Sequence, residues 1–194
     1  MHPNFIRPLR LWPQMKEKIV NYLKELRIPF KGLKIGKHDY DWEINQKFFE
    51  IYDNSDVLDC KISVKLELDK TERMLSLDFE IDGELTSVCD RCLDEIKIPV
   101  SVKEQYIFKF GAERLEESEN VMVIPESDFQ IEVAPLIYDY IILSLPIQKI
   151  HGKHGIKPTK CNTDALKYLE SHDDKDEIDP RWEALKNIKL DNNN

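Results

Sequence analysis

Apolar residues alternate with polar ones through much of the chain, which is the pattern of strands that bury one face. The alternation covers residues 40–44, 58–68, 75–81 and 100–110. The polar stretch between the second and third of these runs predicts a hairpin turn. Asp82-Gly83 predicts a second turn or a bulge, because glycine often interrupts a strand in this way. The pattern therefore favours a mainly antiparallel sheet.

The apolar period changes near residue 134. The stretch APLIYDYIILSL is apolar nearly all round and ends before Pro146, which predicts a mostly buried helix near 134–145. Before it, we expect Phe48 and Phe49 in a short connector, an acidic loop at 112–120 and one or two short strands at 121–132. These elements predict an α+β fold, in which an antiparallel sheet, open or curled toward a half-barrel, packs against the buried helix.

The two ends of the chain differ from its middle. Residues 1–30 form a basic extension, and the apolar spacing within it predicts a short helix. A β-rich domain is expected over residues 31–169. An acidic linker follows at 170–179, where six residues are Asp or Glu. The sequence predicts a C-terminal docking helix at 180–190.

Two short helices are predicted near the C-terminus. Thr163 is suited to cap one that runs through Glu170. For the other, Asp179 is a good N-cap and Pro180 fits the first helical position. Trp182, Leu185 and Ile188 share a face of this last helix. That face must dock on something, in this chain or in another.

Charge is unevenly distributed over the 194 residues, whose net charge is −9. Residues 1–37 hold nine Lys or Arg against two Glu, and residues 140–163 hold no acidic residue. Such basic segments can contact phosphate locally although the whole chain is acidic. The alternative is that both are solvated faces. The candidate contacts to nucleic acid or to a protein partner are Lys149, Lys153, Lys157, Lys160, Arg181 and Trp182.

The sequence predicts a cytoplasmic protein. No apolar run approaches the roughly 20 residues needed to span a membrane. The N-terminal residues lack the apolar core and small-residue cleavage site of a secretory signal. In a reducing compartment, the four cysteines are better explained as thiols or metal ligands than as disulfides.

Cys89 and Cys92 form a Cys-x-x-Cys pair at a predicted turn between strands. That spacing suits tetrahedral Zn²⁺, whereas a redox pair needs a following helix to lower a thiol pKa. A structural zinc site needs four ligands, and the set Cys89, Cys92, His151 and Cys161 is chemically reasonable. The alternative is that His151 and Cys161 are ordinary loop residues. His154 is a further candidate, and Cys60 is better explained as a small buried apolar residue.

No catalytic motif supports an enzyme. The chain has no H-E-x-x-H, no G-x-S-x-G and no phosphate-binding P-loop, and it contains only 6 glycines. A metal-dependent nuclease would need a zinc-bound water and a base, for which His154 and Asp164 are the available residues. Their spacing does not support that role, so we expect a protein without catalytic activity.

Four sequence features occur in an order that resembles the YceD-like family, the large ribosomal RNA subunit accumulation proteins of bacteria and plastids. They are CDRCL, SLPIQKIH, a lone Cys161 and DPRWEALKNIK. The resemblance runs from about Gly32 to Leu190. It implies a role in accumulation of large-subunit ribosomal RNA, in a family without an established catalytic activity.

The resemblance also bears on the metal ligands. Cys89 and Cys92 match the family's first cysteine pair, His151 matches a histidine that many members have, and Cys161 matches a later cysteine. Some members have more than one cysteine in that later region, so in this chain His151 either replaces a ligand or the site is incomplete.

The expected function is therefore a non-enzymatic factor in biogenesis of the large ribosomal subunit. Its expected partners are precursor large-subunit ribosomal RNA, a ribosomal protein or both, with no membrane and no small-molecule substrate. The alternative functions are a zinc-stapled protein-interaction module unrelated to RNA and, less favoured, a metal-dependent nuclease.

Overall fold

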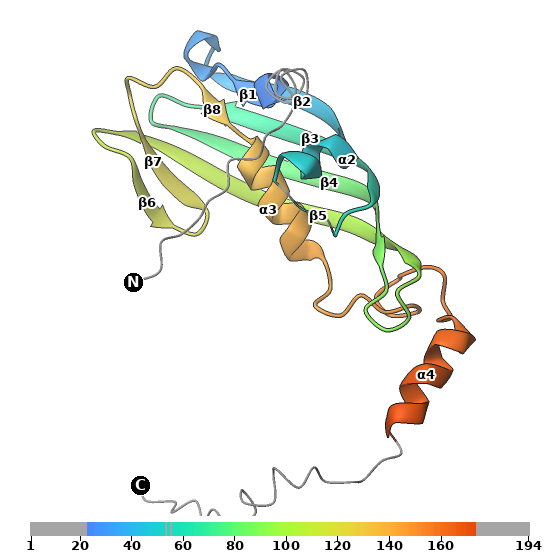
Figure 1. Ribbon diagram of the computed structural model, residues 1–194. Coiled ribbons are helices and arrows are strands. Elements are labelled where there is room, and N and C mark those ends of the chain that lie inside the picture. The colour runs from blue at the N-terminus through green and yellow to red at the C-terminus, as the bar shows by residue number, and fades with distance from the viewer. Residues whose placement is uncertain (1–22, 53, 55, 174–194) are drawn as a thin grey trace, which may run out of the picture.

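One open, six-stranded sheet forms the body of the protein in a computed structural model that describes residues 23–52, 54 and 56–173 (Figure 1). Its strand order is β2-β3-β4-β5-β7-β6. Neighbouring strands are antiparallel except β5 and β7, which are parallel. The strands are β2 (Gly36–Asn45), β3 (Asp59–Lys70), β4 (Met74–Val88), β5 (Glu95–Gly111), β6 (Leu115–Ser118) and β7 (Val121–Pro125). The predicted α+β class with a mainly antiparallel sheet is confirmed, and the sheet does not close into a barrel.

A short second ribbon and two of the helices, α2 (Gln46–Ile51) and α3 (Ala134–Ser144), lie against the sheet. Strand β1 (Arg27–Ile28) pairs with β8 (Ile131–Glu132), and this pair leads into helix α3, which crosses one face of the sheet (Figure 1). The remaining helices are η1 (Phe30–Gly32) and α4 (Thr163–Asp173). Figure 1 shows α4 beyond the end of the sheet where β4 turns into β5. No helix in the described part of the chain is long and apolar enough to cross a membrane.

The core lies between α3 and the sheet. The alternating apolar side chains of β3, β4 and β5 point into it, as the sequence pattern predicts. From α3, Ala134, Ile137 and Ile141 are buried on the sheet, at the spacing of one helical face. Leu143 on the same helix is 80% exposed. The helix was expected to be mostly buried, and it instead buries one side.

Helix α2 corrects the expected connector around Phe48 and Phe49. Both side chains are fully buried, and their rings meet edge to face with centroids 5.4 Å apart. The side chain of Asn45 caps the helix by accepting a hydrogen bond from the backbone N–H of Lys47 at 3.1 Å. Tyr138 of α3 packs on both rings. The helix therefore exists because tertiary contacts bury two adjacent aromatic residues, which a short sequence window does not reveal.

Two further strand predictions were wrong. Strand β4 continues straight through Gly83, which pairs with Ile62 on one side and Val100 on the other. A Cβ at this position would lie 2.6 Å from the Cα of Ile62 and closer still to the Lys61 carbonyl oxygen. The glycine therefore permits close approach of β3 and does not form a turn. The expected acidic loop at 112–120 contains β6, whose residues are all exposed and thus lack an apolar alternation.

We expect Gly83→Ala to lower the free energy of unfolding by about 1–3 kcal/mol, because the added methyl group must push β3 away from β4. Urea unfolding followed by circular dichroism measures this loss. Gly32→Ala is the matched control, since a Cβ there meets no atom within 4 Å. Equal stability of the two variants would show that β3 and β4 separate at no cost.

Several predictions concern residues outside the described part of the chain. Residues 23–25 are helical, and the rest of the predicted N-terminal helix lies outside the described residues. Most of the acidic linker and all of the helix at 180–190, with Arg181 and Trp182, also lie outside it. Helix α4 begins at Thr163 as expected and continues to Asp173.

Candidate metal centre

The Cys-x-x-Cys pair lies in the turn between β4 and β5. This turn is closed by two backbone hydrogen bonds, from Cys89 N–H to the Asp94 carbonyl at 2.8 Å and from Leu93 N–H to the Cys89 carbonyl at 3.0 Å. Leu93 adopts a left-handed conformation, with φ of 64°. The backbone N–H of Arg91 donates to the sulfur of Cys89 at 3.4 Å. Both thiols are buried, so the turn holds its two sulfurs away from solvent.

The loop after α3 lies against this turn. Asp90 joins the two, because its N–H donates to the Lys149 carbonyl at 2.9 Å and its carboxylate accepts from the Lys149 N–H at 2.6 Å. Further along, Lys97 of β5 and Lys157 exchange backbone hydrogen bonds of 2.7 and 3.0 Å. These contacts fix both arms of the loop on the β4–β5 end of the sheet.

The interior of the loop is shaped by Gly152, one of its two glycines, and by the buried Ile156. Gly152 has φ of 76°, and a Cβ there would lie 2.6 Å from the Thr159 carbonyl oxygen. Only glycine fits such a close backbone approach at a left-handed position without strain. Ile156 is 1% exposed and its N–H bonds to the Lys153 carbonyl at 2.8 Å. The loop therefore folds back on itself and turns His151 inward.

Cys89, Cys92, His151 and Cys161, together called the metal centre below, place their ligand atoms within 4.8 Å of one another. The Nδ1 atom of His151 lies 3.4 Å from the sulfur of Cys92 and 3.5 Å from that of Cys161. The sulfurs of Cys89 and Cys161 are 4.0 Å apart. Residues from two distant parts of the chain thus converge on one point.

These separations fit a tetrahedral ion. With bonds of about 2.3 Å to sulfur and about 2.0 Å to nitrogen, a tetrahedral Zn²⁺ separates two sulfurs by about 3.8 Å and a sulfur from a nitrogen by about 3.5 Å. Three of the four residues are buried and Cys161 is half-buried, so water has little access. Three thiols and an imidazole are donors of the kind that closed structural zinc sites use. The residues present therefore suit such a metal ion.

The electrostatics of the metal centre favour a thiolate at Cys89. Burial opposes ionisation, but the backbone N–H groups of Cys92, Arg91 and His151 and the imidazole of His151 face this sulfur. Together they lower the pKa of the Cys89 thiol to about 6. At Cys161, burial and the neighbouring sulfurs of Cys92 and Cys89 raise the thiol pKa to about 11. The centre without metal therefore carries a thiolate at Cys89 and a neutral thiol at Cys161 near pH 7.

This asymmetry predicts how metal affinity depends on pH. Because Cys161 remains a thiol up to a pKa of about 11, it must release a proton whenever Zn²⁺ binds. That proton makes the affinity rise by at least about tenfold per pH unit between pH 6.5 and 8.5, and Cys92 must also bind as a thiolate. Cys89 is already ionised above pH 7 and adds little to this slope. Competition with a chromophoric chelator, corrected for the chelator's own protonation, measures the slope of zinc affinity against pH. An affinity that does not change over this range would contradict the assignment of Cys161 as a protonated thiol.

The other candidate ligands lie elsewhere. Cys60 is buried on the core stripe of β3, where its sulfur donates to the Ile44 carbonyl at 3.8 Å and burial, aided by Asp59, raises its pKa to about 12. His154 is exposed and lines a surface hollow with Ile98 and Pro146. Neither residue belongs to the group of ligand atoms that could hold a metal.

The predicted contact lysines divide into two kinds. Lys153, Lys157 and Lys160 are exposed. The Lys149 side chain is only 18% exposed, and its amine lies 3.5 Å from the Ser87 hydroxyl and 3.6 Å from the Asp56 carboxylate. Lys149 therefore holds the loop against the sheet. Asp90, which bonds to the backbone of Lys149, was not singled out from the sequence, and its place inside the Cys-x-x-Cys pair was the only available signal.

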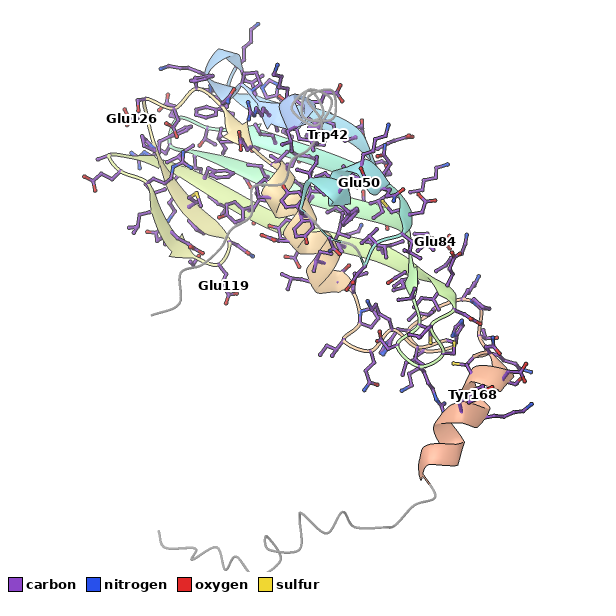
Figure 2. The ribbon with its side chains drawn as sticks, in the orientation of Figure 1. Trp42, Glu50, Glu84, Glu119, Glu126 and Tyr168 are labelled. Carbon is purple, nitrogen blue, oxygen red and sulfur yellow. The ribbon has the colours of Figure 1, made fainter. Side chains whose placement is uncertain are left out.

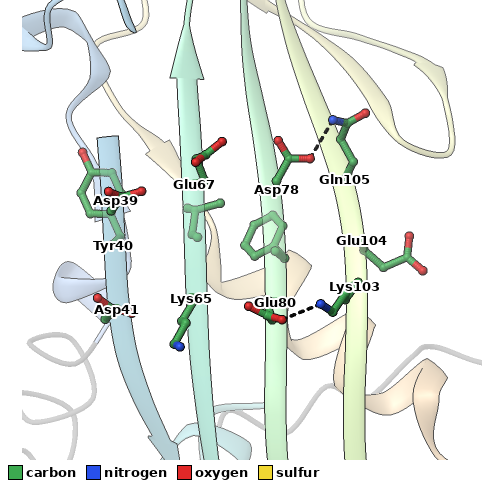
Figure 3. Close-up of a pocket in the computed structure, with 12 residues that line it drawn as sticks. Asp39, Tyr40, Asp41, Lys65, Glu67, Asp78, Glu80, Lys103, Glu104 and Gln105 are labelled. Atoms are coloured by element: carbon green, nitrogen blue, oxygen red, sulfur yellow. Dashed lines mark hydrogen bonds and ion pairs between the residues drawn. The ribbon is translucent and has the colours of Figure 1, made fainter. Parts of the chain in front are cut away.

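A hollow of about 730 Å³ forms a shallow groove over the polar face of the sheet (Figure 3). Its side chains partner one another across strands, as in the Lys103–Glu80 ion pair and the bond from Gln105 to Asp78. Asp39, Asp41 and Glu67 also line it, so acidic groups predominate. The groove is a charged sheet surface, separate from the metal centre.

Comparisons with known proteins agree with the resemblance read from the sequence. A family model described as "Large ribosomal RNA subunit accumulation protein YceD" matches residues 77–189. The Bacillus subtilis (strain 168) protein YlbN, described as uncharacterized, is 26% identical over 139 residues, which cover 70% of this chain and 78% of that protein. No solved structure matches at a significant level. The matched range begins within β4 and includes all four residues of the metal centre.

Proposed function

Because the chain belongs to the YceD family, we propose that it is a factor for accumulation of large-subunit ribosomal RNA that acts by binding and not by catalysis. It would work in the cytoplasm, where thiols stay reduced and available to a metal. The family description supports a role connected with ribosomal RNA. The metal centre, whose four protein ligands suit a structural ion, supports action by binding and not by catalysis.

The observation that carries this proposal is a set of exposed cations around the metal centre. Arg91, Lys153, Lys157 and Lys160, called the cationic rim below, are all exposed, and within the described part of the chain none of them forms an ion pair. Arg91 lies between the two cysteines of the turn, and the lysines lie in the loop that contains His151. Cations without ion-pair partners among the described residues, at one end of a protein whose net charge is −9, suit contact with RNA phosphates.

Zinc would make this rim rigid. Two ligands come from the β4–β5 turn and two from the loop, so one bound ion joins the segments that carry all four cations. Four protein ligands fill a tetrahedral ion and leave no open position for a water nucleophile. This donor set supports a structural ion, and it disfavours the nuclease alternative that relied on His154 and Asp164.

A basic ribosomal protein is the second candidate partner. The acidic side chains over the polar face of the sheet, among them Asp39, Asp41, Glu67, Asp78 and Glu80, favour a positively charged protein over RNA at that surface (Figure 3). The two partners would contact different faces of the molecule. A zinc-stapled interaction module unrelated to RNA would use the same polar face alone.

We expect the triple variant Lys153→Ala/Lys157→Ala/Lys160→Ala to bind fragments of precursor large-subunit RNA more weakly than the wild type does, whatever the sequence of the fragment. The slope of log affinity against log salt should fall by about 2–3, since each lost phosphate contact removes about 0.7–0.9. Fluorescence anisotropy from low to physiological salt measures both effects. The matched control replaces Lys61, Lys65 and Lys103 on the polar face of the sheet, which removes the same charge elsewhere. Equal loss in both triple variants would overturn the assignment of the rim.

The role in cells is tested by pull-down from growing cells at low salt, with bound RNA sequenced and bound proteins identified. Wild type should enrich precursor large-subunit RNA or large-subunit proteins, and Cys89→Ser/Cys92→Ser should not. Absence of ribosomal material from both would contradict the proposed function. Enrichment of ribosomal protein without RNA, retained in the triple lysine variant, would favour the second candidate partner.

A further inference from the structure

A hollow of about 540 Å³, lined by apolar residues and by Ser144, Gln148 and His154, lies at the C-terminal end of α3, where the loop that contains His151 begins. We call it the docking hollow, and Ile98, Pro99, Pro146, Ile147 and His154 are among the residues that line it. Ile147 is fully exposed, at 101%, and nearby Leu143 is 80% exposed. A single exposed apolar side chain needs no explanation, but a fully exposed Ile147 in the wall of a hollow, four residues after an exposed Leu143, indicates a surface that another segment covers.

Charge is arranged around this hollow in a specific way. His151, Lys153, Lys157 and Lys160 belong to the loop that begins at the hollow, and no acidic residue occurs between residues 140 and 163. The cationic rim has no ion-pair partner in the described residues. An occupant that fits the hollow and the rim together must therefore be both apolar and acidic.

We propose that the occupant is the C-terminal segment of this same chain, residues 174–190. Residues 173–179 contain five acidic residues and one lysine, which suits the cationic rim. Trp182, Leu185 and Ile188 follow at helical spacing, which suits the apolar lining of the docking hollow. The order along the chain is the one that docking needs, with acidic residues first and the apolar face after them.

The connection is long enough for this arrangement. Helix α4 starts two residues after Cys161, at the metal centre, and its 11 residues are about 16 Å long. The eight residues from 174 to 181 span about 26–29 Å when fully extended. They can therefore return residue 182 past the whole length of α4. Figure 2 shows Tyr168 of α4 at this end of the molecule and Glu119 and Glu126 at the other.

The family match supports treating the segment and the metal centre as one unit. The matched range extends to residue 189, so it includes Trp182, Leu185 and Ile188 together with all four residues of the metal centre. It excludes β2 and β3. The inference does not depend on RNA binding, although a docked segment would lie over the same cations that RNA would contact.

Methyl NMR of the full zinc-loaded chain tests the docking directly. The δ1 methyl signal of Ile147 should be shifted by the indole ring of Trp182, and Trp182→Ala should return it to the position of a free isoleucine. Trp12→Ala is the matched control and should leave the signal unchanged. Hydrogen exchange tests the same contact from the other side. In the wild type, the amides at 182–189 should be protected at least about tenfold, and Ile147→Asp should abolish that protection. Because Ile147 is fully exposed, this change should not unfold the sheet.

Three results would overturn the proposal. The Ile147 methyl signal could be that of a free side chain in the wild type, which would mean that the hollow is open. It could be shifted and indifferent to Trp182→Ala, which would assign the cover to another segment. It could also depend on Trp182 only at high protein concentration, which would place the segment on a second copy. Each differs from a failure of RNA binding, which leaves the Ile147 signal unaffected.

Discussion

Replacing Cys89 and Cys92 together by serine should reduce bound zinc from about one equivalent per chain to less than about a tenth, because two of the four ligands are lost. The loop from 147 to 161 should lose its amide protection, since the ion no longer joins it to the β4–β5 turn. The sheet should remain folded, because Cys89 and Cys92 lie at one end of the buried core and most of that core lies under α3. Elemental analysis and hydrogen exchange with mass spectrometry measure the three effects on one sample.

Cys60 provides the matched control for this experiment. It is a buried thiol on β3, outside the metal centre, so Cys60→Ala should keep a full equivalent of zinc and a protected loop. Zinc retained by the double serine variant would contradict the ligand assignment. Unfolding of the sheet along with the loop would contradict the independence of the two parts.

The largest loss of stability from a single substitution is expected for Phe48→Ala, at about 3–5 kcal/mol in the free energy of unfolding. Phe48 is fully buried, and its ring packs against Phe49, Tyr52 and Tyr138 with centroid distances of 5.4, 5.4 and 6.4 Å. Its removal leaves a cavity between α2 and α3 that these rings cannot fill without giving up their own contacts. Urea unfolding monitored by circular dichroism measures the loss.

Phe129→Ala removes the same side chain from a site that is 59% exposed, and it should cost less than about 1 kcal/mol. If the two variants lost equal stability, the aromatic cluster of α2 and α3 would not form part of the cooperative core. If Phe48→Ala cost little stability, Tyr52 and Tyr138 would have moved to fill the cavity.

The strands were predictable where one face of the sheet is buried and the other is solvated. In β3 and β5, this environment selects an apolar residue at alternate positions, so sequence and structure agree. Gly83 shows the limit of that approach, because its role depends on the neighbouring strand and not on its own sequence window. Strand β6 has no buried face, and α2 is too short to show a helical period. The parallel pairing of β5 and β7 depends on chain reversal through β6 and is not encoded in any alternation.

The metal centre was predictable in its residue types, and its surroundings were not. Cys89 and Cys92 have a spacing that is common in structural zinc sites, and His151 and Cys161 are loop residues whose side chains can bind zinc. The inward position of Lys149 depends on Ser87 and Asp56, which are distant in sequence. Whether a loop residue faces solvent or the sheet depends on tertiary contacts. The sequence alone therefore could not distinguish the inward Lys149 from the exposed lysines of the loop.

The spacing of the ligands along the chain also sets an order for events during protein synthesis. Cys161 comes 72 positions after Cys89, so β5, the short strands and α3 all emerge from the ribosome between the two halves of the metal centre. The hairpins of the sheet pair sequential strands and can form while synthesis continues. Complete coordination must wait until residue 161 is available. Zinc binding at these four residues would therefore report that nearly the whole domain has been made. Under zinc shortage, full-length chains would have a complete sheet, and the loop at 147–161 would not be joined to the β4–β5 turn.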